Sequence, residues 1–382
     1  MDRTSDRISL GRPNISDEEI AAAERVLRSR WLVLGPENRA FEEELAAYCG
    51  RRFAAVVSSG TAALHLALLA RSAAPSSVLV PAFTFPATAS VTRFLPSPPA
   101  LYLGDVDAGS FCLPAATVKS YLDSPLAGEK GLCISVHQFG FPSPLPADAN
   151  RAESRLLSDA ACAIGVRGAM DGHAVCLSFH PRKLLTTGEG GAVLSDDESF
   201  IEEVRRLRAH SLVARPGAEV MELPRCGLNY RLPEMGAALG RVQLRRLPGF
   251  IERHREIAAH YRHRLGQSGL AQRLQADHPE RIYQTLALVL PEGTDRMGLR
   301  QALLQQGIET QIASYGLHRL AAFADARVLH ADGSTSPVSA AALPVSDRLH
   351  ELGLALPLHS ELRLAEVDRV CDALLGLLSS AA

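Results

Sequence analysis

Short apolar runs that alternate with helix-like segments constrain the fold of this chain more than any other feature of its sequence. Five such runs, each four to seven residues long, occupy residues 54–57, 77–81, 100–106, 132–137 and 155–159. Helical or irregular segments separate them, and this order is typical of βαβ units. The sequence therefore predicts an α/β fold in which helices flank a large, mostly parallel central sheet.

The length of 382 residues is more than one ordinary hydrophobic core supports, and it suits one large and one smaller domain. A long predicted helix covers residues 233–267, and we place the domain boundary inside it, near Leu247 and Pro248. The chain then divides into a large domain, residues 1–247, and a smaller C-terminal α/β domain, residues 248–382.

Helix signals lie at both ends of the chain. Ser16 and Glu19 form a capping box, which predicts a helix that continues to about Ser29. In the C-terminal part we expect a strand at residues 285–290, helices at 297–306 and 364–378, and a loop at 330–342.

The balance of charges favours a small-molecule partner. The formal net charge is −2, and no block of like charge stands out, so we expect neither nucleic acid nor an anionic membrane as a partner. The first residues are polar, and no apolar run approaches the length of a membrane span, which indicates a cytoplasmic protein. Seven scattered cysteines without metal-ligand spacing argue against a disulfide framework and against a structural metal site.

A strand that leads into a lysine and then into a glycine-rich turn occupies residues 174–193. Apolar and small residues alternate from 175 to 179 as in a buried strand, Lys183 follows, and the segment 188–191 allows a tight turn before a second strand at 192–194. This arrangement predicts that Lys183 stands at the end of a strand.

Lys183 is a candidate nucleophile. In a site with little water and beside a second cation, Arg182, its ammonium form is disfavoured, so that the free amine can attack a carbonyl. The alternative is a surface lysine on a loop, which is the ordinary environment of lysine.

A candidate anion site lies at residues 58–62, where a buried strand passes through a small-residue turn into an alanine- and leucine-rich helix. The backbone N–H groups of Gly60, Thr61 and Ala62 would stand at the helix N-terminus, which stabilises a phosphate. The alternative is an ordinary strand-to-helix turn.

Phe85 and Asp159 each follow another of the apolar runs, and ligands of parallel sheets bind beyond the carboxyl ends of the strands. Phe85 can lie flat on a planar ring, although a core position is the alternative. A carboxylate such as Asp159 at the tail of a buried strand needs a cation, either in a structural ion pair or on a ligand.

Together these groups fit one cofactor. A phosphate cup, an aromatic ring, a carboxylate for a protonated ring nitrogen and an amine for an aldehyde are what pyridoxal 5'-phosphate requires for its electron-sink chemistry.

The same segments resemble the DegT/DnrJ/EryC1/StrS aminotransferase family, the sugar and cyclitol aminotransferases of the aspartate-aminotransferase fold, or fold type I. The similarity covers nearly the whole chain. In the order of the family, the matching segments are Gly35-Pro36 with Phe41-Glu42, then residues 59–68, 81–88, 105–107, Val136-His137 with Gly140, 159–161, 178–183 with 187–191, 227–231, 307–310 with His318, and 356–359.

The resemblance implies a role for each matching residue around the cofactor. Lys183 would hold the cofactor aldehyde as a Schiff base and later move the proton, while Asp159 would pair with the ring nitrogen. The remaining cofactor-binding residues would be Gly60, Thr61 and Ser178 at the phosphate, Phe85 on the ring, and Asn229 reaching the phosphate from the neighbouring subunit of a homodimer.

Other positions of the resemblance are less defined. His180 matches a position near the cofactor, although a merely hydrogen-bonded histidine is the alternative. Arg231 and His318 are candidates for substrate binding, and for Arg231 the alternative is a structural ion pair. Cys162 stands where the family usually has Gln or His beside the phenolic oxygen of the cofactor, so that hydrogen bond is weakened or comes from another group. The segment 281–285 also lacks a histidine that is common in the family.

The leading functional hypothesis is a pyridoxal-phosphate-dependent aminotransferase that uses glutamate or glutamine as the amino donor. Its acceptor would be a keto sugar, such as a nucleotide-linked 4- or 3-keto-6-deoxysugar, or a keto cyclitol, in secondary-metabolite or surface-polysaccharide biosynthesis. The precursor of an aminoaromatic compound is a further alternative.

The sequence disfavours several alternative functions. Deoxysugar dehydratases of the family carry histidine in place of the lysine, so Lys183 argues against them, and an intact pair of Lys183 and Asp159 disfavours a silent regulator. A dinucleotide enzyme would need G-x-G-x-x-G after the first strand, and a serine hydrolase would need G-x-S-x-G; neither pattern is present where it is required.

Overall fold

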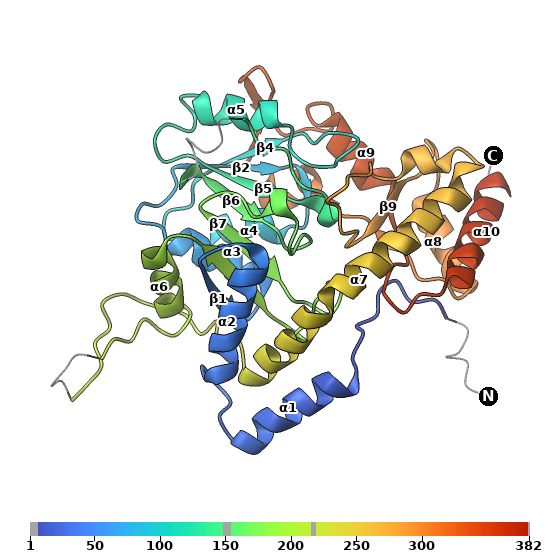
Figure 1. Ribbon diagram of the computed structural model, residues 1–382. Coiled ribbons are helices and arrows are strands. Elements are labelled where there is room, and N and C mark those ends of the chain that lie inside the picture. The colour runs from blue at the N-terminus through green and yellow to red at the C-terminus, as the bar shows by residue number, and fades with distance from the viewer. Residues whose placement is uncertain (1–6, 148–153, 215–218, 381–382) are drawn as a thin grey trace.

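The computed structural model describes residues 7–147, 154–214 and 219–380. Within these ranges the central element is a nine-stranded sheet in the order β1-β8-β7-β6-β5-β2-β4-β12-β13 (Figure 1). In that order the strands are β1 (Phe53–Val57), β8 (Gly191–Ser195), β7 (Ala174–Ser178), β6 (Leu156–Asp159), β5 (Leu132–Val136), β2 (Ser77–Pro81), β4 (Ala100–Gly104), β12 (Arg327–Leu329) and β13 (Thr335–Pro337).

The sheet is mostly parallel, as the alternation of strands and helices predicted. Strands β7, β6, β5, β2, β4 and β12 pair in parallel, whereas β8 runs antiparallel to both of its neighbours. Because β8 reverses between β1 and β7, these two strands point the same way. The carboxyl ends of β1, β7, β6, β5 and β2 therefore open at one edge of the sheet, where ligands of such sheets bind.

Helices cover both faces of the sheet because its strand residues are apolar on both sides. In β1, Ala55 and Val57 pack toward α3 (Gly60–Leu69), while Ala54 and Val56 pack toward the opposite face. The first face carries α3, α4 (Ala87–Arg93) and α6 (Glu198–Leu207), and the second carries α2 (Pro36–Cys49), α5 (Ala115–Asp123) and the first half of α7 (Glu234–Gly266).

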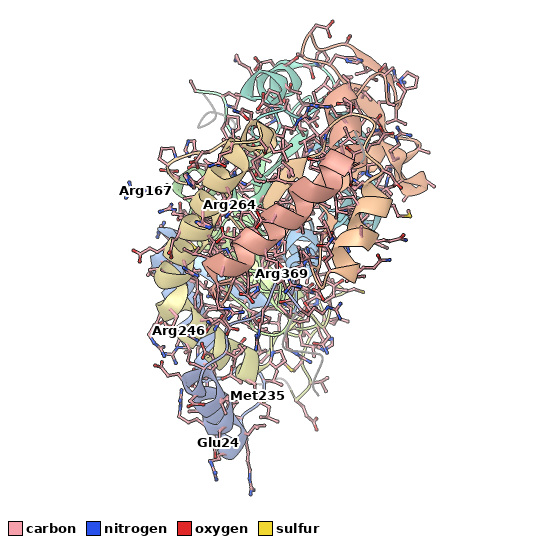
Figure 2. All side chains as sticks on the ribbon, turned by 90° about the vertical axis from the view of Figure 1, so that its right-hand side faces the viewer. Glu24, Arg167, Met235, Arg246, Arg264 and Arg369 are labelled. Carbon is pink, nitrogen blue, oxygen red and sulfur yellow. The ribbon has the colours of Figure 1, made fainter. Side chains whose placement is uncertain are left out.

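Helix α1 (Asp17–Ser29) begins at the predicted capping box of Ser16 and Glu19. It packs against α7, where the buried carboxylate of Glu19 pairs with Arg246 at 2.5 Å. Figure 2 shows α1, labelled at Glu24, next to the start of α7, labelled at Met235 and Arg246.

A second, three-stranded antiparallel sheet lies in the C-terminal part of the chain. Its order is β10 (Gln311–Ile312), β14 (Gly353–Leu356) and β9 (Leu286–Val289), and it packs with α8 (Arg296–Gln305), α9 (Pro344–Leu352), α10 (Leu364–Ser380) and the second half of α7. Figure 1 shows α7 running from the large sheet to this unit.

Helix α7 is continuous through Leu247 and Pro248, so the predicted domain boundary stays a prediction. The predicted loop at 330–342 is wrong in part, because β13 lies within it and pairs with β12. Strands β12 and β13 belong to the large sheet, although their residues fall within the range predicted for the smaller domain, 248–382. A further pairing that the sequence did not indicate joins β3 (Phe83–Thr84) to β11 (Tyr315–Gly316).

No helix in the described ranges is both long enough and apolar enough to cross a bilayer. The cytoplasmic location stays a prediction.

Candidate active site

Glycine allows two strand ends to meet at the ligand-binding edge of the sheet. Gly191 of β8 pairs with Val57 of β1 on one side and with Ser178 of β7 on the other. A Cβ atom at Gly191 would lie 2.5 Å from the carbonyl oxygen of Ser59 and 2.7 Å from that of Leu177. Only glycine fits there, and the turn after β1 therefore lies beside the end of the lysine-bearing strand.

The N-terminus of α3 forms part of this edge. The Oγ of the N-cap residue Ser59 accepts a hydrogen bond from the N–H of Ala62 at 3.0 Å, so this N–H already has a partner and its contribution to the anion site stays a prediction. The N–H groups of Gly60 and Thr61 have no partner inside the helix. A Cβ atom on Gly60 would lie 2.7 Å from the Cβ of Ser178, which places the Ser178 hydroxyl group beside the helix N-terminus.

Asp159 ends β6 at the same edge and is 6% exposed. Its Oδ2 accepts a hydrogen bond from the Thr88 hydroxyl at 2.8 Å, and its Oδ1 accepts one from the N–H of Ala161 at 3.2 Å. Burial raises the pKa of Asp159, while these two hydrogen bonds and the charge of Lys183 act in the opposite direction. A cationic ligand atom would therefore stabilise the ionised carboxylate.

Lys183 follows β7 in a turn that its own N–H closes by donating to the carbonyl oxygen of His180 at 2.8 Å. Its Nζ donates to the Sγ of Cys162 at 3.1 Å, which brings the predicted cofactor neighbour Cys162 next to the amine. The two other lysines of the chain, Lys119 and Lys130, are exposed and lie elsewhere. Lys183 is thus the chain's one lysine at this edge.

His180 lies in the same turn and is partly exposed. Its Nδ1 accepts a hydrogen bond from the N–H of Arg182 at 3.1 Å, and its Nε2 lies 3.9 Å from a carboxylate oxygen of Glu189. Burial lowers the pKa of His180, Glu189 raises it, and the charges of Lys183 and Arg182 lower it further. The net direction favours the neutral imidazole, which agrees with the acceptor role of Nδ1 in the hydrogen bond from Arg182.

The ring of Phe85 is 63% exposed, so the alternative that Phe85 is a core residue is wrong. It makes an edge-to-face contact with the ring of Tyr315, with 6.1 Å between the two ring centroids. Tyr315 belongs to β11, which pairs with β3. An exposed aromatic face beyond the end of β2 is available for stacking on a planar ring.

Three further predicted residues are Asn229, Arg231 and His318. The segment that carries Asn229 and Arg231 lies beside the turn after β1, because the N–H of Ser58 donates to the carbonyl oxygen of Tyr230 at 2.8 Å. Asn229 is exposed, and its backbone forms an isolated bridge with Ala209, while Arg231 is partly exposed. The side chain of His318 is 1% exposed, and its Nε2 lies 2.9 Å from a carboxylate oxygen of Asp347. The His318 ring is thus enclosed and already paired, and its role in substrate binding stays a prediction.

The sequence interpretation missed Thr88 and Gln284. Thr88 lies in the matching segment 81–88, three residues after Phe85 at the start of α4, so its helical spacing was a signal that it shares the site. Gln284 lies in the segment 281–285 that lacks the common histidine, and its carboxamide bonds the backbone beside Lys183.

The residues at this edge fit pyridoxal phosphate. Free helix N–H groups beside the Ser178 hydroxyl suit a phosphate, and the buried Asp159 suits a protonated ring nitrogen. The exposed face of Phe85 suits the ring, and the amine of Lys183 suits the aldehyde.

Comparisons with known proteins agree with this geometry. Residues 13–375 match the model of the DegT/DnrJ/EryC1/StrS aminotransferase family. The aminotransferase TlmJ from Streptoalloteichus hindustanus is 28% identical, with a TM-score of 0.83 over 98% of this chain and 100% of that one. DesV from S. venezuelae is 27% identical, with a TM-score of 0.80 over 98% of this chain and 99% of that one.

The PLP form of Spr1654 from Streptococcus pneumoniae is 23% identical, with a TM-score of 0.84 over 98% of this chain and 100% of that one, and it shows the shared fold. The family match spans nearly the whole chain, and its range contains Lys183, Asp159 and the turn at Gly60. The chain therefore belongs to the DegT/DnrJ/EryC1/StrS aminotransferase family, and it is a pyridoxal-phosphate-dependent aminotransferase of fold type I.

Proposed function

We propose that this aminotransferase moves an amino group from glutamate or glutamine to a keto sugar, namely a nucleotide-linked 4- or 3-keto-6-deoxysugar, or to a keto cyclitol. The reaction would serve secondary-metabolite or surface-polysaccharide biosynthesis. The observation that carries the proposal is the placement of Lys183 and the buried Asp159 at one sheet edge in a chain that matches this family throughout. Spr1654 is named as a sugar aminotransferase, which supports a sugar acceptor.

In this proposal each residue acts on a defined part of the cofactor or substrate. Gly60, Thr61 and Ser178 hold the phosphate, and Asp159 keeps the ring nitrogen protonated. Lys183 would hold the cofactor covalently through its aldehyde and, once released, its amine would take up and deliver the proton that the substrate carbon loses. When bound, pyridoxal phosphate supplies the electron sink for transamination.

Borohydride reduction tests the lysine assignment. We expect the protein purified with cofactor to be coloured, and reduction followed by peptide mapping to place the cofactor on Lys183. Lys119 and Lys130 are exposed internal controls, because any non-specific reaction would label them as well. Cofactor fixed to either of them instead would contradict the proposal.

A panel of keto acceptors tests the substrate class. With glutamate as donor, we expect an amino product from a nucleotide-linked keto-deoxysugar or from a keto cyclitol, detected by mass spectrometry. Loss of a hydroxyl group without amination would instead indicate the dehydratase alternative, which the intact Lys183 disfavours.

We also propose that the active site is shared between the two subunits of a homodimer, with Asn229 reaching the phosphate of the neighbouring subunit. Asn229 is exposed, as are the large apolar side chains of Trp31, Leu32 and Val33. Val33 pairs with Pro233, four residues after Asn229, so these apolar side chains adjoin the Asn229 segment. Exposed apolar patches of this kind are typical of interaction surfaces.

Mixing two inactive variants tests the shared site. If Lys183→Ala and Asn229→Ala subunits exchange at random, half of the dimers are hybrids, and each hybrid has one intact site and one site with both lesions. About a quarter of the wild-type activity should then return. If all cofactor contacts came from one chain, no site would be rescued and mixing would restore nothing.

A further inference from the structure

The side chain of Gln284 makes hydrogen bonds to the backbone on both sides of Lys183. Its Oε1 accepts from the N–H of Leu184 at 2.9 Å, and its Nε2 donates to the carbonyl oxygen of Arg182. The carbonyl of Arg182 belongs to the peptide group that precedes the Cα of Lys183, and the N–H of Leu184 belongs to the one that follows it. One carboxamide therefore holds both peptide groups that meet at Lys183.

This arrangement fixes the direction of the lysine side chain. The two soft backbone dihedral angles of Lys183 rotate these two peptide planes, so tethering both planes restrains both angles. The turn is also closed from within, since the N–H of Lys183 donates to the carbonyl oxygen of His180. The Cα–Cβ bond of Lys183, from which Nζ extends toward Cys162, is left with little freedom.

Gln284 is itself firmly held. It is 8% exposed, and its backbone N–H donates to the carbonyl oxygen of Phe139 at 3.1 Å. Three residues earlier, the fully buried guanidinium group of Arg281 donates to the carbonyl oxygens of Gln275 and Ala276 and lies 4.2 Å from the ring centroid of Tyr283. The carboxamide is thus anchored in the chain segment that leads into β9.

We propose that Gln284 is a positioning residue that holds Lys183 at the angle and depth at which its amine reaches the cofactor and the substrate. This inference rests on the proposed role of Lys183. Displacement of a reacting group by about 1 Å can lower a rate by about 100-fold, so the two hydrogen bonds carry a large kinetic effect without touching the reacting atoms.

A second buried glutamine provides a matched control. The Oε1 of Gln243 lies 3.5 Å from the N–H of Thr186, three residues after Lys183, and its Nε2 donates to Glu19. Its removal also leaves buried polar groups without a partner, which costs about 1 to 3 kcal/mol for each such group. It does not release the peptide groups that flank Lys183.

The experiment compares Gln284→Ala, Gln284→Glu and Gln243→Ala by two measurements besides kinetics. Hydrogen exchange at the Leu184 amide is followed in the cofactor-free protein, and the ratio of visible ellipticity to absorbance is followed with cofactor bound. For Gln284→Ala we expect exchange at Leu184 to be at least about tenfold faster. We also expect a changed ellipticity ratio and a kcat lower by about 10- to 100-fold, with KM nearly unchanged.

Gln284→Glu keeps an acceptor for Leu184 but places an oxygen against the Arg182 carbonyl. The Gln284→Glu variant should keep the Leu184 amide protected from exchange and still have a lower kcat than the wild type. If Gln284→Ala does not fold, the Gln284→Glu variant alone tests the inference. Gln243→Ala should lose thermal stability but keep the wild-type kcat and ellipticity ratio.

Two results would overturn the inference: wild-type kcat and ellipticity in both Gln284 variants, or the same kinetic loss in Gln243→Ala. Either of these results leaves the proposed function intact if borohydride reduction still fixes the cofactor on Lys183 in every variant. A label that is absent from Lys183 in the wild type would instead reject the proposed function itself.

Discussion

Lys183→Ala is expected to lower kcat by about 10⁴-fold or more, because one positioned acid–base group contributes roughly 10²- to 10⁴-fold and the covalent bond to the cofactor is lost as well. The fold should persist, since Lys183 is partly exposed and its Nζ makes one hydrogen bond, to Cys162. Steady-state kinetics with glutamate and a keto acceptor from the panel above measure the first effect, and circular dichroism measures the second.

Lys119→Ala is the control for this experiment. Lys119 is exposed on α5 and pairs with Asp123 at 3.0 Å, so its removal should leave kcat at the wild-type level. A small alkylamine added to Lys183→Ala should restore part of the activity, because it supplies an amine where the side chain has been removed. Substantial activity in Lys183→Ala without added amine would reject the assigned role.

Asp159→Asn is expected to retain cofactor but to lose kcat by about 10²- to 10³-fold, the effect typical of removing one preorganised electrostatic partner. A neutral amide cannot keep the ring nitrogen protonated, whereas the proposed phosphate-binding residues Gly60, Thr61 and Ser178 are unchanged. Cofactor content by absorbance and turnover by steady-state kinetics separate binding from catalysis. Near-normal turnover would refute the role.

The stability of the cofactor-free Asp159→Asn variant gives an independent check. Burial raises the pKa of Asp159, so the folded state favours the protonated carboxyl group more than the unfolded state does. The folded protein therefore loses stability as the pH rises through this pKa and the buried carboxylate becomes ionised. At pH 8 the variant should therefore melt at or above the wild-type temperature. Asp105→Asn is the control, because Asp105 accepts hydrogen bonds from Val345 and Ser346 and its loss should reduce stability without affecting turnover.

The sequence predicted the parts of the fold and site that depend on local patterns. The central strands and the positions of Asp159 and Lys183 at their ends follow from runs of apolar residues. The short edge strand β13 escaped prediction because its residues, Thr335–Pro337, are polar or proline and gain their structure only by pairing with β12.

Contacts between distant residues could not be predicted in the same way. Thr88 bonds Asp159 across 71 residues of chain, and Gln284 bonds Leu184 across 100. The spacing of residues within one helix or strand does not indicate a hydrogen-bond partner so far away in the sequence. The prediction for His318 came from resemblance alone, and its pairing with Asp347 depends on how α9 packs.

The antiparallel strand β8 also has a consequence for how the protein is made. Strand β1 stands at the end of the described sheet and pairs with β8, whose residues follow most of the large sheet in the chain. A growing chain on the ribosome therefore exposes β1 without its neighbour until residues 191–195 have emerged. Contacts between residues so far apart in sequence also slow folding, because a long loop must close first. The turn after β1, which we propose binds the phosphate, is encoded early but is expected to be among the last parts of the large sheet to become ordered during synthesis.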